Sequence, residues 1–174
     1  MKYILFFTTI LLFTSCAPIR VNYDYDKAVD FTKYKTYKYF ADIETGLSAL
    51  DQKRFLDALD TKMAEKGFTI AENPDFLIDI KSKQREVPQQ QTVGFGIGGG
   101  GGNIGGGISI GVPVGQPKLS RQIIVEFVDN KGVGLFWQAD SESGFKLNQD
   151  PLKRESRLQT IAHKILNAYP PKVK

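Results

Sequence analysis

The sequence has little of the chemistry on which many enzymes depend. It contains one cysteine and one histidine among 174 residues. A structural zinc cluster takes most of its four ligands from these two residue types, so such a site is excluded in practice. One cysteine cannot form a disulfide within the chain. No Gly-Lys-Ser/Thr stretch occurs either, which excludes a P-loop for nucleoside triphosphates.

Long tracts of one charge are also missing. The chain has 23 Lys and Arg against 19 Asp and Glu, a formal excess of +4. Basic residues are mixed with acidic ones, as in residues 57–66, and no basic tract of five or more exists. This pattern is typical of a solvated, mildly basic surface, and we expect no nucleic-acid partner.

The one long apolar run lies at the N-terminus. Residues 3–12 are apolar apart from two threonines, and Lys2 precedes them. Ten residues are too few to cross a bilayer, which takes about 20. A short apolar run after a positive charge is typical of a signal peptide.

Phe13-Thr14-Ser15-Cys16 follows this run and resembles the bacterial lipobox. Phe13 stands where the lipobox usually has leucine. The resemblance implies that residues 1–15 are removed and that Cys16, the predicted lipidation site, carries a diacylglyceryl group. The alternative is an ordinary secretory peptide that is cut nearby, with Cys16 as an incidental thiol.

Lipidation at Cys16 would make the membrane the first partner of this protein. One acyl chain binds a membrane only marginally, at about 0.8 kcal/mol per buried methylene, but bacterial lipoproteins carry three. Ala17 rather than aspartate follows the cysteine. By resemblance to Gram-negative sorting rules, this favours the outer membrane. Residues 17–20 lack the acidic cluster that marks surface export, so we expect residues 16–20 to tether the protein to the periplasmic side.

The mature chain keeps 159 of the 174 residues, enough for one domain over residues 21–174. Alternation predicts strands around residues 21–25, 37–40, 76–85, 123–127 and 135–139. In the third of these, Phe76, Ile78 and Ile80 point one way, whereas Asp79 and Lys81 point the other. Residues 129–132 predict a hairpin turn.

Two amphipathic helices are predicted as well. Ser48 with Asp51 is typical of a capping box, and Gly67 is the expected end of that helix. Asp150-Pro151 predicts the start of the last helix, before the double proline at residues 170–171. The order strand, helix, strands, helix predicts an α+β fold. We expect a mostly antiparallel sheet with both helices packed on one face, a two-layer sandwich.

Residues 94–115 contain twelve glycines among 22 residues. Gly94, Gly96 and Gly99 satisfy a dinucleotide-binding pattern, but no helix follows them, as that pattern requires. Glycine is the residue with the highest entropic cost of ordering. We therefore interpret residues 94–107 as a loop without a cofactor.

Gly107-Ile108-Ser109-Ile110-Gly111 is a literal G-x-S-x-G, and Asp129 or Asp140 and then His163 follow in the order of an α/β-hydrolase triad. The extended segment after Ser109 and the predicted hairpins do not suit that fold. His163 lies at the edge of the apolar stripe of the last helix, where we expect a surface position. We predict no catalytic residues, and an envelope hydrolase that uses Ser109 stays as an alternative.

The sequence offers two further candidate binding sites. Asp24, Asp26 and Asp30 could suggest calcium, but the glycine and the distal glutamate of a calcium-binding hand are missing. We therefore predict no metal. Trp137 and the tyrosines of the short strands could line a ligand groove, although such aromatics usually belong to the core.

Residues 21–26 and the stretch Asp30-Phe31-Thr32-Lys33-Tyr34-Lys35-Thr36-Tyr37 resemble the opening of a bacterial lipoprotein family catalogued as domain of unknown function 4136. The resemblance continues through residues 73–77, the glycine-rich insert, residues 135–138 and the closing residues 169–171. It implies an envelope lipoprotein without an assigned activity. We expect a non-catalytic protein that binds a protein, lipid or glycan partner in the envelope. An auxiliary subunit of an envelope lipid transporter is a second alternative, by analogy of the strand and helix order.

Overall fold

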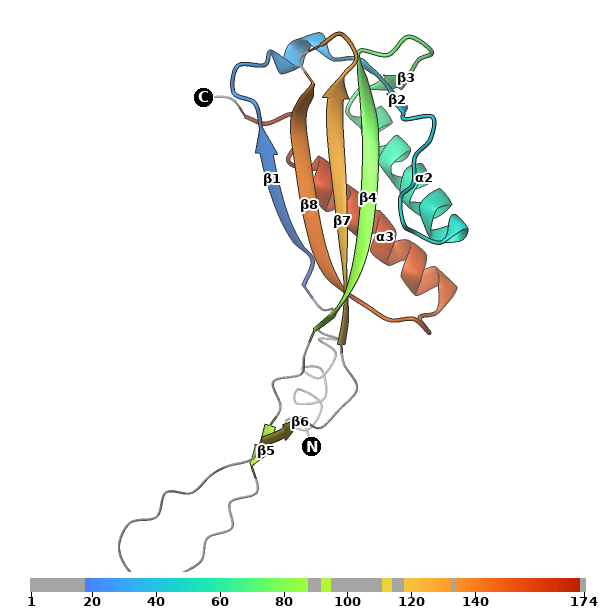
Figure 1. Cartoon of the computed structure of the whole chain (residues 1–174). Coiled ribbons are helices and arrows are strands. Elements are labelled where there is room, and N and C mark those ends of the chain that lie inside the picture. The colour runs from blue at the N-terminus through green and yellow to red at the C-terminus, as the bar shows by residue number, and fades with distance from the viewer. Residues whose placement is uncertain (1–17, 88–91, 95–110, 114–117, 133, 173–174) are drawn as a thin grey trace, which may run out of the picture.

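The structure is a computed structural model, and it describes residues 18–87, 92–94, 111–113, 118–132 and 134–172. The fold is α+β, as the sequence predicts (Figure 1). The elements in chain order are β1 (Arg20–Tyr25), a 3-10 helix η2 (Phe31–Lys33), β2 (Thr36–Tyr39), α2 (Ala49–Glu65), β3 (Thr69–Ile70), β4 (Phe76–Val87), β5 (Thr92–Gly94), β6 (Gly111–Pro113), β7 (Lys118–Asp129), β8 (Leu135–Phe145) and α3 (Pro151–Leu166).

The main sheet has six strands in the order β1-β8-β7-β4-β2-β3. The β1–β8, β8–β7 and β7–β4 pairs are antiparallel, whereas β2 pairs in parallel with both β3 and β4. The prediction of a mostly antiparallel sheet is therefore wrong, because the sheet is mixed. A parallel pair needs a crossover, and α2 supplies it by returning the chain to the end of the sheet at which β2 began.

Both helices begin and end at residues that the sequence indicates. The Ser48 side chain accepts a hydrogen bond from the Asp51 backbone N–H at 3.4 Å, and Gly67 follows α2 with a φ of +83°. At α3, Asp150 Oδ1 accepts from the backbone N–H groups of Leu152 and Lys153. These caps satisfy N–H groups that have no partner inside the helix.

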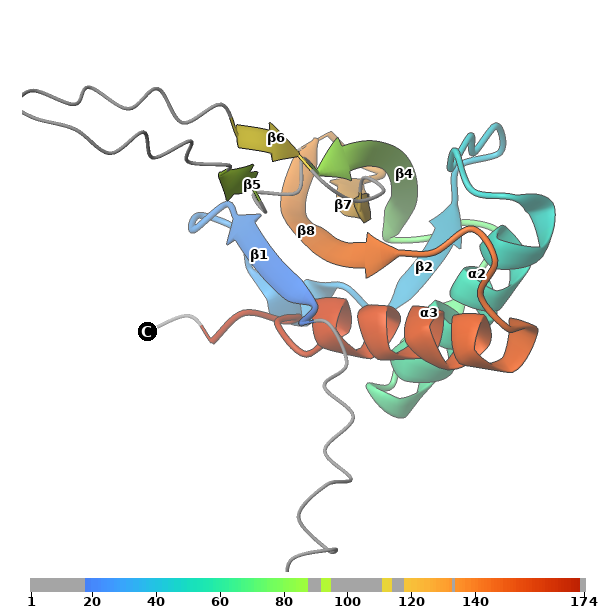
Figure 2. The ribbon, with the colours of Figure 1, turned by 90° about the horizontal axis from the view of Figure 1, so that it is seen from below.

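The core lies between the helices and one face of the sheet. Figure 2 shows α2 and α3 on the same side of the sheet. The fully buried aromatic residues cluster there. The ring centroids of Phe127 and Tyr169 are 4.7 Å apart, and those of Trp137 and Tyr169 are 5.2 Å apart. The helices contribute Phe55, Leu59, Met63, Leu158, Ile161, Ala162, Ile165 and Leu166.

A second, two-stranded sheet extends the β4–β7 hairpin. Val87 lies opposite Lys118 at the end of β4. Thr92 comes five residues after Val87, and its partner Pro113 comes five residues before Lys118. The β5–β6 pair therefore keeps the register of β4–β7, and Figure 1 shows it beyond the lower end of the main sheet. The predicted loop at residues 94–107 lies outside the described residues except for Gly94, the last residue of β5.

Candidate binding groove

The sheet face opposite the helices carries mainly polar side chains. Facing residues of adjacent strands point to the same side of a sheet. Register therefore places alternate residues of β1, β8, β7 and β4 together on this open face. On β4 the alternation is as predicted, since Phe76, Ile78 and Ile80 are buried on the helix side. On the open face Lys81 Nζ lies 2.8 Å from Glu126 and 2.9 Å from Asp79, and these hydrogen bonds raise the pKa of Lys81.

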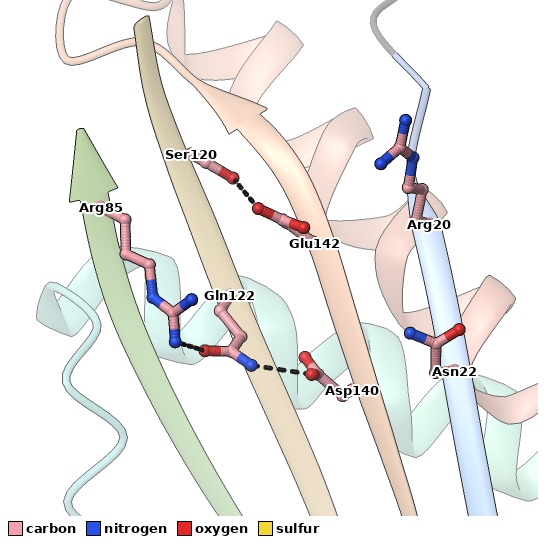
Figure 3. Close-up of a pocket in the computed structure, with 7 residues that line it drawn as sticks. All are labelled: Arg20, Asn22, Arg85, Ser120, Gln122, Asp140 and Glu142. Atoms are coloured by element: carbon pink, nitrogen blue, oxygen red, sulfur yellow. Dashed lines mark hydrogen bonds between the residues drawn. The ribbon is translucent and has the colours of Figure 1, made fainter. Parts of the chain in front are cut away.

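A polar hollow of about 260 Å³ lies on this open face, and we call it the groove. Its lining comes from four neighbouring strands (Figure 3). The lining residues are Arg20, Asn22, Arg85, Ser120, Gln122, Asp140 and Glu142. Two arginines and two carboxylates balance each other, so the groove has no formal net charge.

Hydrogen bonds cross the floor of the groove from strand to strand. Arg85 Nη2 of β4 donates to Gln122 Oε1 of β7 at 3.1 Å. Gln122 Nε2 in turn donates to Asp140 Oδ2 of β8 at 2.7 Å. Ser120 Oγ, which is buried, donates to Glu142 Oε1 at 3.1 Å. These bonds fix the orientation of the floor side chains before a ligand arrives, which lowers the entropic cost of binding.

Several polar groups of the groove have no partner among the residues that the structure describes. Asp140 Oδ1 is buried and accepts no hydrogen bond there. Arg20 and Asn22 lie opposite Glu142 and Asp140 in the β1–β8 register. Within the described chain, their side chains form no hydrogen bond or ion pair. A buried acceptor without a donor costs about 1–3 kcal/mol, so a ligand with N–H or O–H groups would be stabilised here.

The structure does not bring the triad candidates Asp140 and His163 together. Asp140 lines the groove on the open face, whereas His163 is exposed on α3, which packs on the other face. Asp129 accepts a hydrogen bond from Tyr34 Oη at 2.6 Å. Ser109 lies outside the described residues.

The other predicted sites are placed as follows. Cys16 lies outside the described residues, so its lipidation stays a prediction. Asp24, Asp26 and Asp30 each accept a hydrogen bond from a backbone N–H one or two residues further along the chain. Over the described ranges, no group of three or more His, Cys, Asp or Glu side chains could hold a metal ion. No helix in those ranges is long and apolar enough to span a bilayer.

The aromatic residues of the strands belong mostly to the core. Trp137 is fully buried, and Tyr34 and Tyr37 are buried as well. Tyr23 differs, since 54% of it is exposed. None of these aromatic residues lines the groove.

One buried polar cluster was not predicted from the sequence. Asp51 lies among three arginines, with Arg121 Nη1 at 3.2 Å, Arg54 Nη1 at 3.3 Å and Arg154 Nη1 at 3.6 Å. The Arg121 guanidinium also lies 3.6 Å from the centroid of the Phe145 ring. Burial lowers the pKa of Arg121, and Asp51 opposes this shift. The cluster joins α2, β7 and α3, which gives it a structural role.

A second hollow lies at the other edge of the sheet. It measures about 460 Å³ between α2 and the strands β2 and β3. Asp60 Oδ1 accepts hydrogen bonds from Tyr37 Oη at 2.9 Å and from Tyr39 Oη at 2.6 Å. Burial, with this shared carboxylate, raises the pKa of both tyrosines.

The fold and the groove define an α+β protein with an open, polar sheet face. The chain belongs to the family described as "Domain of unknown function (DUF4136)", which matches residues 21–171. No curated protein matches the chain.

Among solved structures, the chain is similar to a PDZ domain protein from Parabacteroides distasonis, with a TM-score of 0.54 and 14% identity. That match covers 95% of this chain and 39% of the other, so this chain spans well under half of that protein. It is also similar to PelC of Paraburkholderia phytofirmans, solved as a dodecamer, with a TM-score of 0.50 and 10% identity. The second match covers 86% of this chain and 95% of PelC. At these identities the likeness concerns the fold alone.

Proposed function

We propose that this protein is a non-catalytic lipoprotein, anchored at the periplasmic side of the outer membrane, that binds an envelope partner in the groove. The partner is a protein, a lipid or a glycan. We further take the domain to be a two-layer sandwich, in which the helices cover one sheet face and leave the other to the partner. The observation that carries the proposal is the groove, with its fixed floor and its unpartnered polar groups.

The position of the groove relative to the predicted anchor supports this function. Lys164 Nζ of α3 donates to the carbonyl oxygen of Ile19 at 3.3 Å, so the chain is held against the domain there. Ile19 lies only three positions after Cys16, a reach of about 10 Å when the chain is extended. Arg20 of the groove is the next residue along the chain. Lipidation of Cys16 would therefore hold the groove close to the membrane surface.

The non-catalytic part of the proposal rests on the surroundings of the candidate groups. General acid-base chemistry needs a base within hydrogen-bond reach of the group that it activates. Asp140 and Glu142 hydrogen-bond with Gln122 and Ser120, and His163 lies across the sheet from them. This arrangement suits ligand binding better than activation of a nucleophile.

A photocrosslinking amino acid in place of Asn22 tests this function in whole cells. We expect a crosslinked species in the outer-membrane fraction. The control is the same substitution at Gln159, an exposed position on α3. Equal crosslinking from both positions, or none from Asn22, would contradict a binding role for the groove.

A further inference from the structure

Opposite charges alternate across the groove. The two carboxylates lie on β8, Arg20 lies on the neighbouring strand β1, and Arg85 lies on β4 beyond β7. Arg20 faces Glu142 directly. Facing side chains on paired strands have their Cβ atoms about 4.5–5.5 Å apart. The groove therefore presents a cationic and an anionic position side by side, with no net charge between them.

This arrangement selects the class of ligand. A simple anion would meet the carboxylates, and a simple cation would meet the arginines, so each would be repelled by half of the groove. A zwitterion with its two charges a few bonds apart is attracted by both halves. A guanidinium binds phosphate with two parallel hydrogen bonds. A primary ammonium has three N–H donors, and Asp140 Oδ1 lacks a donor within the described chain.

We propose that the groove binds the phosphoethanolamine headgroup of a membrane phospholipid. Arg20 holds the phosphate, and Asp140 with Glu142 on the adjacent strand β8 holds the ammonium group. This inference rests on the proposed function, because lipidation of Cys16 is what brings the groove to a membrane surface. The two-carbon link between ammonium and phosphate suits facing positions on adjacent strands.

The lining of the groove favours a headgroup over a glycan. Small-molecule sites usually offer apolar and aromatic surface, against which the face of a sugar ring could stack. None of the seven lining residues is aromatic. Charge complementarity is therefore the main source of affinity that these side chains provide.

Vesicle flotation tests the inference with residues 16–174 carrying Cys16→Ala, so that no lipid anchor contributes. The buried hydrophobic residues of the described chain lie between Phe31 and Tyr169, so this protein keeps the core. One set of vesicles has equal parts phosphatidylethanolamine and phosphatidylglycerol. The matched set has phosphatidylcholine instead, which carries the same phosphate but a quaternary ammonium without N–H donors.

We expect at least about tenfold tighter binding to the phosphatidylethanolamine vesicles, because the ammonium N–H groups form charge-assisted hydrogen bonds that a quaternary ammonium cannot form. Asp140→Asn and Arg20→Gln should each remove most of this preference. The matched controls are Asp57→Asn and Lys53→Gln on α2, whose side chains are 61% and 71% exposed and pair with each other. These control variants should keep the preference for phosphatidylethanolamine vesicles.

Other outcomes overturn the inference in distinct ways. Equal binding to both vesicle types would show that the ammonium N–H groups are not recognised. A second outcome is that the protein binds soluble glycerophosphoethanolamine, loses this binding in the Asp140→Asn and Arg20→Gln variants, and binds both vesicle types equally. This outcome would show a soluble ligand rather than a lipid. Binding of an N-acetylglucosamine oligomer in the groove would show a glycan ligand. In each case, crosslinking from position 22 in cells would still decide the proposed function separately.

Discussion

Arg121 Nη1 lies 3.2 Å from Asp51 Oδ2, and the two side chains are only 6% and 1% exposed. The pair joins β7 to the first turn of α2, and Arg154 brings α3 to the same carboxylate. A buried charge that loses its partner keeps its desolvation cost but not the compensating attraction. Asp51 thus holds three guanidinium groups at this end of the core.

Asp51→Asn should therefore lower the free energy of unfolding by about 3–5 kcal/mol, because it leaves the charge of the buried Arg121 uncompensated. The control is Asp57→Asn on the same helix, an exposed residue that pairs with Lys53 at 2.7 Å. Exposed pairs contribute about 0–1 kcal/mol. Urea titration measures both variants. A loss below about 1 kcal/mol for Asp51→Asn would mean that the cluster contributes little.

Substitution of Trp137 tests the packing between the sheet and the helices. Its side chain is fully buried, with the Phe127 ring 4.6 Å away. Trp137→Ala should cost about 3–5 kcal/mol. Leu135 on the same strand is 48% exposed, and Leu135→Ala should cost less than about 1 kcal/mol. Similar losses for the two variants in denaturant titration would be inconsistent with this core.

Stability should fall at alkaline pH. Burial raises the pKa of Tyr34, Tyr37, Tyr39 and Tyr169 above the ordinary value of 10.0. These tyrosines stay protonated in the fold when they ionise in the unfolded chain. Their contribution to the free energy of unfolding is complete below about pH 10. It is lost as the pH rises above this value, by about 1.4 kcal/mol per pH unit for each tyrosine.

Tyr169→Phe isolates one of these contributions. Tyr169 Oη is buried and has no hydrogen-bond partner in the described part of the chain. Its removal should cost less than about 1 kcal/mol at pH 7 and should make the alkaline loss of stability shallower. Tyr23→Phe is the control, since that ring is exposed. An alkaline slope that Tyr169→Phe leaves unchanged would refute the assignment.

The glycine-rich insert should contribute little to stability. We expect that replacing residues 96–106 with an Asn-Gly turn changes the thermal midpoint by no more than a few degrees. Glycine has no side chain to pack, and loop closure costs only about 0.6 kcal/mol per doubling of length. Differential scanning calorimetry measures the midpoint. A collapse of the midpoint would indicate that these residues pack in the fold and would revive a ligand role for their backbone.

Local features of the fold could be predicted from the sequence because they depend on neighbouring residues. The Ser48 and Asp150 caps and the alternation of β4 are of this kind. The parallel pairing of β2 with β4 was missed, because it depends on the path of α2 rather than on the strands themselves. The two-residue strand β3 carries no periodic signal at all.

The groove could not be predicted for a related reason. Its residues come from β1, β4, β7 and β8. The sequence of each segment alone predicts only a strand with one solvated face. Only the register places Asn22 opposite Asp140 and Arg20 opposite Glu142. From the sequence alone, Arg121 would likewise be predicted to be a surface cation. Only the fold places Asp51 beside it.

The central claim is that the protein is held at the outer membrane by lipid on Cys16. Intact-mass spectrometry of the mature protein, with cell fractionation of the Cys16→Ala variant, tests it most directly. The account predicts that the mature chain begins at an acylated Cys16 and that the variant folds but leaves the outer-membrane fraction. A mature chain that begins elsewhere without lipid, or a Cys16→Ala protein that stays in the outer membrane, would contradict the account.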